Sequence, residues 1–396
     1  MLEGETYTVH IGSNLDVLPT LEDNSIDSIV TDPPYELGFM GKKWDSSGIA
    51  YSVELWKECL RVLKPGGHLL SFGGTRTWHR VAVAIEDAGF EVRDSIAWMY
   101  GSGFPKSLDV SKAIDKAAGA EREVIGKKIT GNARTEEGWS GGQTTVDETA
   151  PSTHEAQQWE GWGTALKPAF EPIVVARKPL IGTVADNVLT HGTGALNIDG
   201  SRIGTERTIT NHTMRPPGDS VVGNGAKATG EQSLNPEGRW PANVILDEYS
   251  AEILDEQSDA SRFFYVAKAS KRDRNEGLED LEATSAAEMV DRKEGSAGMD
   301  NPRAGAGRTS GAKNFHPTVK PTDLMRYLVK LVTPPNGTVL DPFTGSGSTG
   351  KAAILEGFRF VGIELTEDYI PIIEGRLKHA EQLKAEQQDK DKEQLF

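Results

Sequence analysis

The stretch that decides the fold of this 396-residue chain is Thr338-Val-Leu-Asp-Pro-Phe-Thr-Gly-Ser-Gly-Ser-Thr-Gly350. A short apolar run ends at the carboxylate of Asp341, and a glycine-rich loop then leads into a helix-like pattern. The next strand-like run, residues 359–364, also ends in an acid, Glu364. This order of strand, glycine-rich loop, helix and strand is typical of a nucleotide-binding βαβ unit, whose ligands bind at the carboxyl ends of the strands.

The glycine-rich loop is compatible with more than one ligand. Its glycines satisfy the G-x-G-x-x-G pattern of dinucleotide-binding loops (Gly345, Gly347 and Gly350). Glu364 lies about 20 residues further on, where an acid can bind ribose hydroxyls. Asp341 stands directly before the loop, and its carboxylate suits a cationic or amino-bearing ligand, such as S-adenosylmethionine, better than a pyrophosphate.

A phosphate-binding P-loop fits the same stretch less well. Gly350-Lys351 has the ending of such a loop, but Ala352 occupies the position at which a Ser or Thr hydroxyl would bind magnesium. We therefore do not expect a nucleotidase.

A second acidic stretch, Thr31-Asp-Pro-Pro-Tyr35, lies near the other end of the chain. It follows an alternating apolar and polar run, residues 25–31, and two prolines cannot continue a strand, so we expect the strand to end at Asp32. This places a carboxylate, two rigid prolines and an aromatic ring at the ligand-binding edge of a sheet. Because Asp-Pro-Pro is also good turn chemistry, a solvated turn is the alternative.

Helix-like and strand-like patterns alternate along residues 1–100, which implies a largely parallel sheet. We expect helices at residues 51–63, 80–89 and 322–332. The predicted fold is α/β, with a mostly parallel, Rossmann-like sheet of seven strands centred near Thr8, Ile29, Leu70, Ile96, Val174, Leu340 and Val361.

The chain is expected to divide into six segments. The sheet takes residues 1–105, its final strand lies within residues 163–180, and its glycine-rich half is residues 313–375. Residues 106–162, rich in Gly, Thr, Glu and Gln, are predicted to be a flexible insertion. Residues 181–312 form a loop-rich insertion with apolar islands at 243–246 and 262–268, and residues 376–396 form a charged tail.

Composition restricts the classes of function. The net charge of −16 argues against a chain that is basic all over and leaves room only for local positive patches. The single cysteine, Cys59, lies in an apolar helical pattern, so we expect neither an internal disulfide nor a zinc cluster, and no metal site. No signal peptide and no apolar run long enough to span a membrane is expected.

The two acidic motifs together, Asp32-Pro-Pro-Tyr35 and Asp341-Pro-Phe-Thr-Gly-Ser-Gly347, resemble those of the DNA methyltransferases that methylate amino groups, at adenine N6 or cytosine N4. The catalytic motif precedes the cofactor motif, as in the subgroup called β, in which a target-recognition region lies between them. Residues 181–312 occupy that place. Asn314-Phe-His-Pro-Thr-Val-Lys-Pro321 is similar to the family's segment before the cofactor loop, whereas Gly12-Ser13-Asn14 departs from the Gly-Asp of many relatives.

The resemblance implies an S-adenosyl-L-methionine-dependent methyltransferase and assigns its site residues. The catalytic ones are Asp32, Pro33, Pro34 and Tyr35. The cofactor's amino-acid and ribose region is assigned to Asp341, Phe343, Gly345 and Gly347, its ribose hydroxyls to Glu364, and its methionine end to His316, Thr318 and Lys320. Local turn capping is the alternative for His316 and Thr318.

The implied partner is double-stranded DNA, whose target base must leave the helix to reach these groups. Asp32 and the Pro33 carbonyl would accept the hydrogens of the amino group, and Tyr35 would stack on the base. Candidate DNA contacts, with ordinary surface charge as the alternative, are Lys42, Lys43, Trp44, Arg262, Lys268, Lys271, Arg272 and Arg274. Methylation at C5 of a base is disfavoured because it requires a reactive cysteine, and Cys59 lies in an apolar helical pattern.

Adenine N6 is the favoured target because an Asp, rather than the Ser common in cytosine-N4 enzymes, precedes Pro33-Pro34. Cytosine N4 is the first alternative, and a dinucleotide-dependent oxidoreductase or an inactive DNA-binding protein are alternatives from other classes. The resemblance further implies the cytoplasm of a bacterial or phage-infected cell and a restriction-modification setting. A homodimer, a partner nuclease and the recognition sequence are left open.

Overall fold

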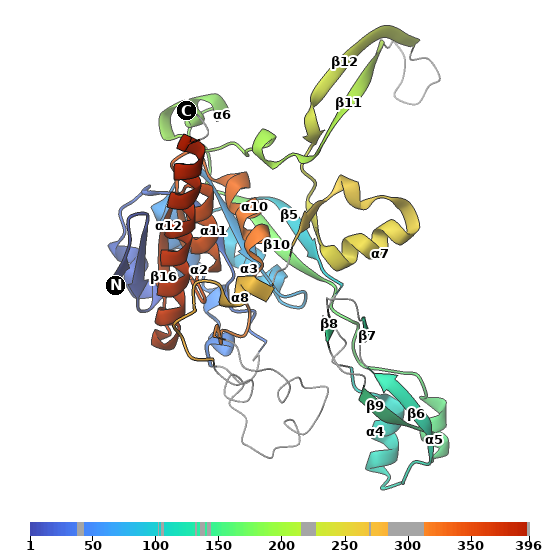
Figure 1. The fold of residues 1–396 in the computed structure, drawn as a ribbon. Helices are drawn as coiled ribbons and strands as arrows, with labels where there is room; N and C mark the ends of the chain where they lie inside the picture. The colour runs from blue at the N-terminus through green and yellow to red at the C-terminus, as the bar shows by residue number, and fades with distance from the viewer. Residues whose placement is uncertain are drawn as a thin grey trace. The chain divides into compact units, whose positions relative to one another are not determined.

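The structure is a computed structural model that describes residues 1–37, 43–101, 103, 107–130, 133–134, 139–140, 144–214, 227–268, 271–283 and 313–393. The chain forms two compact units (Figure 1). The first comprises residues 1–101, 170–290 and 310–396, and the second comprises residues 102–169 and 291–309. No helix of the described residues is long and apolar enough to cross a membrane.

A ten-stranded sheet forms the centre of the first unit, with the order β1-β2-β16-β15-β3-β4-β10-β5-β13-β14. Most neighbours pair in parallel, but β1 is antiparallel to β2, and β10 is antiparallel to both β4 and β5. The strands are β1 (Leu2–Glu3), β2 (Tyr7–Ile11), β3 (Ile26–Thr31), β4 (Leu63–Phe72), β5 (Glu91–Met99), β10 (Phe170–Arg177), β13 (Val244–Asp247), β14 (Tyr265–Ala267), β15 (Thr338–Asp341) and β16 (Arg359–Glu364).

The predicted α/β class and mostly parallel sheet are confirmed, and all of the seven predicted strand centres lie in strands. The count of seven was too low, because β1, β13 and β14 extend the sheet at its two ends. These additional strands contain only 2, 4 and 3 residues. Such short runs carry too few residues for an alternating pattern to be recognised.

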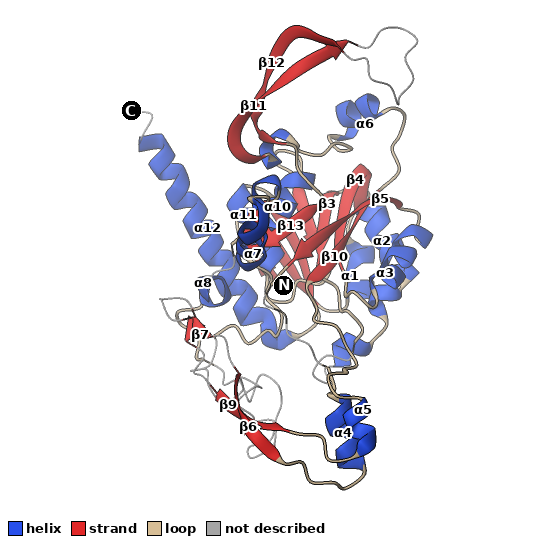
Figure 2. Ribbon diagram, turned by 90° about the vertical axis from the view of Figure 1, so that its right-hand side faces the viewer, coloured by secondary structure: helices blue, strands red, loops and turns tan. Residues whose placement is uncertain are grey.

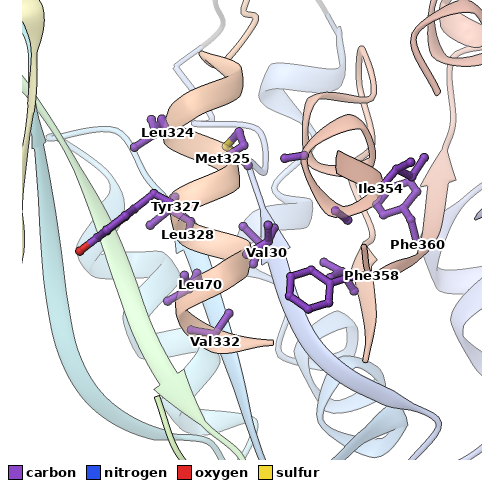
Figure 3. Packing of buried hydrophobic residues seen from close by; sticks show 14 of the residues in the cluster. Val30, Leu70, Leu324, Met325, Tyr327, Leu328, Val332, Ile354, Phe358 and Phe360 are labelled. Atoms are coloured by element: carbon purple, nitrogen blue, oxygen red, sulfur yellow. The ribbon is translucent and has the colours of Figure 1, made fainter. Parts of the chain in front are cut away.

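Helices cover both faces of the sheet. Figure 2 shows α2 (Val53–Val62) and α3 (Trp78–Asp87) on one side and α10 (Thr322–Val332), α11 (Ser348–Glu356) and α12 (Ile370–Glu393) on the other. The predicted helices at 51–63, 80–89 and 322–332 correspond to α2, α3 and α10. Figure 3 shows the apolar face of α10 packed over Val30 of β3 and Leu70 of β4, all of them buried. This packing fixes the start of α10 next to the end of β3.

Shorter elements connect these layers. In the first unit they are α1 (Asn14–Val17), η1 (Leu18–Thr20), η3 (Lys43–Ser46), η4 (Ile49–Tyr51), α6 (Val184–His191), η5 (Asp199–Ser201), the hairpin of β11 (Ile203–Met214) and β12 (Lys227–Arg239), α7 (Glu248–Ser258), η6 (Ser261–Phe263), α8 (Lys271–Asn275) and η8 (Glu367–Tyr369). The second unit contains α4 (Val110–Ala117), β6 (Val124–Thr130), β7 (Ala133–Arg134), β8 (Trp139–Ser140), β9 (Thr144–Thr149) and α5 (His154–Gln158).

The second unit has a polar centre of its own. Asp115 of α4 is fully buried and forms an ion pair with Arg122, 2.5 Å away. The same carboxylate accepts hydrogen bonds from the backbone N–H groups of Ser152 and Thr153, at 3.1 and 3.0 Å. These contacts join α4 to the segment that precedes α5.

Candidate active site

The glycine-rich loop between β15 and α11 requires glycine for two reasons. Gly345 and Gly347 have φ values of 55° and 76°, in the left-handed region that other residues rarely adopt. A Cβ atom at Gly345 would also lie 3.1 Å from Nε2 of His316. Glycine at position 345 therefore lets the loop backbone lie directly beside the His316 ring.

Two buried acids stand at the strand ends next to this loop. Asp341 accepts hydrogen bonds from Oγ1 of Thr31 at 2.6 Å and from the backbone N–H of Phe343 at 3.0 Å. Burial raises the pKa of Asp341 to about 6. Since Thr31 precedes Asp32, this contact also fixes the end of β3 to the end of β15.

Glu364 ends β16 and accepts hydrogen bonds from the backbone N–H groups of Gly345 at 2.7 Å and Thr366 at 2.8 Å. Burial raises the pKa of Glu364 to about 7, although these hydrogen bonds oppose the shift. Carboxyl groups with raised pKa values gather at ligand sites more often than elsewhere. Glu364 is thus a buried acceptor held against the glycine-rich loop.

His316 closes the loop from the side of the segment that precedes α10. Its Nδ1 donates to the carbonyl oxygen of Thr318 at 2.7 Å, and its ring lies edge-on to Tyr369, with 4.6 Å between ring centroids. Burial lowers the pKa of His316 to about 4, so the ring is neutral at physiological pH. The local contact expected for turn capping is therefore present, and the ring also faces Gly345.

Residues 12–14, where this sequence differs from the Gly-Asp of many relatives, contact the same loop. The side-chain amide of Asn14 donates to the carbonyl oxygen of Pro342 at 3.3 Å, and Asn14 is buried. The backbone N–H of Gly12 donates to the carbonyl oxygen of Glu364 at 2.8 Å. The Asn at position 14 thus supports the loop from β2 and α1.

Asp32 directly follows β3, which ends one residue earlier than predicted, and the two carboxylate oxygens of Asp32 differ. Oδ2 accepts a hydrogen bond from Nζ of Lys320 at 2.7 Å. Oδ1 is buried and has no hydrogen-bond partner in the described part of the chain. Because an unpaired buried carboxylate oxygen is unfavourable, it indicates an acceptor that a ligand's N–H would satisfy.

Lys320 connects Asp32 to Tyr35 and to Glu171 of β10. Its Nζ lies 3.2 Å from the Tyr35 hydroxyl and 3.2 Å from Oε2 of Glu171. Burial alone would lower the pKa of Lys320, but the carboxylates of Asp32 and Glu171 raise it above its ordinary value. The ammonium has three N–H donors, and each has an acceptor here. A contact from Lys320 to the cofactor's carboxylate would require one of these hydrogen bonds to be released.

Tyr35 is fixed by its hydroxyl. The hydroxyl donates to Oε2 of Glu171 at 2.7 Å. Burial, followed by the charges of Asp32 and Glu171, raises the pKa of Tyr35 well above its ordinary value, so the phenol stays neutral. The ammonium of Lys320 lies 5.3 Å from the centroid of its ring.

Sequence reasoning missed two residues of this site, Glu171 and Arg376. Glu171 is at the start of β10, and because β10 runs antiparallel to β4 and β5, its start lies at the edge where those strands end. Arg376 of α12 is fully buried and donates to the carbonyl oxygen of Ser346 at 2.6 Å and to the hydroxyl of Ser348 at 3.1 Å. An arginine in a helix otherwise rich in charged residues gives no signal of burial.

Of the candidate DNA contacts, the structure describes the side chains of Arg262, Lys268 and Arg274. Lys42 lies outside the described residues, as do the side chains of Lys43, Trp44, Lys271 and Arg272. Arg274 is partly buried and donates to the carbonyl oxygen of Asn314 at 3.0 Å, whereas Lys268 is exposed. The Arg262 side chain is 52% exposed, pairs with Asp259 at 3.0 Å and lies 5.1 Å from the centroid of the Phe263 ring.

Comparison with known proteins identifies the family. The profile of a family described as DNA methylase matches residues 26–375. The chain belongs to this family. It is 24% identical to the Type II methyltransferase M.HindIII of Haemophilus influenzae. The alignment spans 329 residues and covers 82% of this chain and 68% of that relative. It is 42% identical to the DNA adenine methyltransferase YhdJ of Escherichia coli (strain K12). This alignment spans 72 residues and covers 18% of this chain and 24% of that relative.

Solved structures with a similar backbone fold include that of the PvuII DNA methyltransferase, which is described as cytosine-N4-specific. It has 13% sequence identity and a TM-score of 0.45, with 94% of this chain and 86% of that chain covered. The predicted membership of the amino-methylating DNA methyltransferases is confirmed by the family match. As a member of this DNA methylase family, the chain uses S-adenosyl-L-methionine as its cofactor.

The residues present fit that cofactor. Gly345 leaves space that a Cβ would fill, and Glu364 offers a buried acceptor beside it. The described residues contain no group of His, Cys, Asp or Glu that could hold a metal ion.

Proposed function

We propose that this DNA methylase transfers a methyl group to the N6 amino group of adenine in double-stranded DNA, after the target base has left the helix. The observation that carries the proposal is the buried Oδ1 of Asp32, which has no hydrogen-bond partner among the residues that the structure describes. An exocyclic amino group brings the N–H donor that this oxygen lacks. Cytosine N4 is the second candidate because its amino group has the same donors, and the preference for adenine rests on the resemblance in Asp32-Pro33-Pro34.

The residues at the end of β3 would activate the amino group. Its lone pair is delocalised into the base, which makes the nitrogen a poor nucleophile. Asp32 Oδ1 accepts one amino hydrogen and the Pro33 carbonyl the other, which draws the nitrogen toward a tetrahedral geometry. The positive charge that develops on the nitrogen is stabilised by the Asp32 carboxylate, which then takes the proton. When bound, S-adenosylmethionine supplies an electrophilic methyl group on a sulfonium sulfur.

The glycine-rich loop and its neighbours would hold the cofactor. Glu364 would accept hydrogen bonds from the ribose hydroxyls. The amino-acid and ribose region would contact the loop and the end of β15, and the methionine end would contact the segment before α10. The proposed contacts, in addition to Glu364, are Asp341, Phe343, Gly345, Gly347, His316 and Thr318, whereas Lys320 is proposed to act mainly on Asp32.

Tyr35 is the proposed stacking partner of the target base. Its hydroxyl donates to Glu171 at 2.7 Å, which holds the far end of the ring in place before the base arrives. A ring that is already ordered loses little further entropy when a base stacks on it.

An exposed cluster near η6 is the proposed contact to the DNA backbone. The guanidinium groups of Arg239 and Arg262 lie 5.3 and 5.1 Å from the centroid of the Phe263 ring, which is 46% exposed. Exposed ion pairs such as Arg262–Asp259 contribute little, so a phosphate can replace the Asp at small cost. Arginines beside an exposed aromatic ring are suited to nucleic acid.

The proposal is tested by methylating DNA of mixed sequence with isotope-labelled S-adenosylmethionine and analysing the nucleosides by mass spectrometry. The expected product is labelled N6-methyladenine. Labelled N4-methylcytosine alone would replace the adenine assignment with the second candidate. Labelled 5-methylcytosine, or no labelled nucleoside, would refute amino-group methylation.

A further inference from the structure

We infer that Glu171 is a positioning residue: through Lys320 and Tyr35 it holds Asp32 so that Oδ1 remains free for the target amino group. The inference rests on the proposed function. Its basis is one connected set of contacts in which Oε2 of Glu171 accepts from the Tyr35 hydroxyl at 2.7 Å and pairs with Nζ of Lys320 at 3.2 Å. Lys320 in turn donates to only one oxygen of Asp32, Oδ2, at 2.7 Å.

The role follows from what Lys320 would do without Glu171. Its side chain is 8% exposed, so an N–H that loses its acceptor cannot turn to bulk water. Lys320 already contacts Oδ2 of Asp32, and Oδ1 of the same carboxylate is buried without a hydrogen-bond partner in the described chain. An ammonium beside a carboxylate with a free oxygen would bind that oxygen as well. Glu171 prevents this by pairing with the ammonium of Lys320 at 3.2 Å.

Glu171 also sets the charge of the site. Lys320 carries one positive charge, and the carboxylates that it contacts carry two negative charges when ionised. One negative charge therefore remains near the position where the attacking nitrogen becomes positive. Without Glu171, Lys320 would neutralise Asp32, and the transition state would lose this stabilisation.

The backbone around Glu171 is suited to a fixed role. Residue 171 pairs with Trp98 of β5, and Ile173, two residues later, pairs with Phe72 of β4. The backbone N–H of Gly73 donates to the carbonyl oxygen of Pro172 at 3.0 Å. Side chains on such a central strand are held more precisely than side chains on loops.

The test compares Glu171→Gln and Glu171→Ala in the full chain. Single-turnover methyl transfer should fall about 100-fold for Ala and about tenfold for Gln, which keeps an oxygen acceptor and the size of the side chain. The affinity for S-adenosylhomocysteine and the KM for DNA should stay within about twofold of wild type. Partial rescue by Gln, with binding intact, is the pattern of a positioning residue.

Two further variants make the test specific. Glu91→Gln removes the partner of Arg177, 2.6 Å away at the other end of β10, and should leave the transfer rate unchanged. In a Lys320→Met background, Glu171→Gln should lower the rate by much less than in wild type, because Glu171 acts through Lys320. Full additivity of the two substitutions would refute this route.

The outcomes separate the inference from the proposed function. If the wild-type chain methylates DNA and Glu171→Ala has the wild-type transfer rate, Glu171 has no positioning role. If Glu171→Ala weakens S-adenosylhomocysteine binding while the transfer rate is kept, Glu171 is a cofactor residue instead. A wild-type chain that transfers no methyl group to DNA would overturn both proposals.

Discussion

Replacement of Glu364 by Gln should remove the pH dependence of cofactor binding near neutral pH. Burial raises the pKa of Glu364 to about 7, and Asp341, whose charge contributes to that shift, has a pKa of about 6. An ionised Glu364 can accept both ribose hydroxyls, whereas a protonated one has lost part of its acceptor capacity. The apparent affinity of the wild-type chain should therefore fall as the pH drops through 7.

The size of the effect follows from the pKa. Below about pH 7 the carboxyl group must first release its proton, so the apparent Kd should rise about tenfold for each pH unit. The effect on folding has the opposite sign. The raised pKa of Glu364 favours the ligand-free folded state by about 3 kcal/mol below the ordinary pKa of about 4.5, and this is lost as the pH rises through about 7.

The assay is isothermal titration of S-adenosylhomocysteine from about pH 6 to about pH 8.5, with wild type and Glu364→Gln in parallel. The variant should bind about 10- to 100-fold more weakly at the upper end, because two hydrogen bonds to a charged group are weakened, and its profile should be nearly flat. A flat wild-type profile, or a variant that keeps the wild-type slope, would refute the role given to Glu364.

Three further predictions concern the loop, its support and the cysteine. Gly345→Ala should weaken S-adenosylhomocysteine binding at least about tenfold, because a φ of 55° and the His316 ring 3.1 Å away both oppose a Cβ; unchanged affinity in a titration would contradict this. Arg376→Met should lower the free energy of unfolding in denaturant titrations by about 3 kcal/mol, since buried oxygens around Ser346 lose their donor; a loss below about 1 kcal/mol would argue against this support. Cys59→Ala should keep the wild-type rate of methyl transfer, and thiol reagents should leave the native chain active, because burial raises the pKa of the thiol; loss of transfer in a folded variant would reopen a cysteine mechanism.

Much of the fold could be predicted because its periodic elements are long. Helix α10, for instance, has the bounds that the apolar spacing of residues 322–332 predicts. The short strand β13 overlaps the apolar island at 243–246, and β14 lies within the island at 262–268; neither island is long enough to be assigned to the sheet from its sequence. Whether such an island joins a sheet depends on an unpaired edge, here that of β5, which no local pattern reveals.

The acids of the site could be predicted because each follows a strand. Asp32, Asp341 and Glu364 lie at the ends of β3, β15 and β16, where a parallel sheet gathers its ligands. Glu171 could not be predicted in this way, since it begins a strand, and its place depends on the antiparallel insertion of β10 between β4 and β5. The contact between Lys320 and Asp32 spans 288 positions in the sequence and depends on how α10 packs on the sheet.

The most direct test of the account is the single-turnover rate of methyl transfer from labelled S-adenosylmethionine to DNA, measured for wild type and for Asp32→Asn. Asn keeps the size of the side chain but replaces one acceptor oxygen with a donor and removes the negative charge. The account predicts that wild type labels the DNA and that Asp32→Asn is slower by about 1000-fold or more while it still binds S-adenosylhomocysteine. A folded Asp32→Asn chain with the wild-type rate would contradict the account.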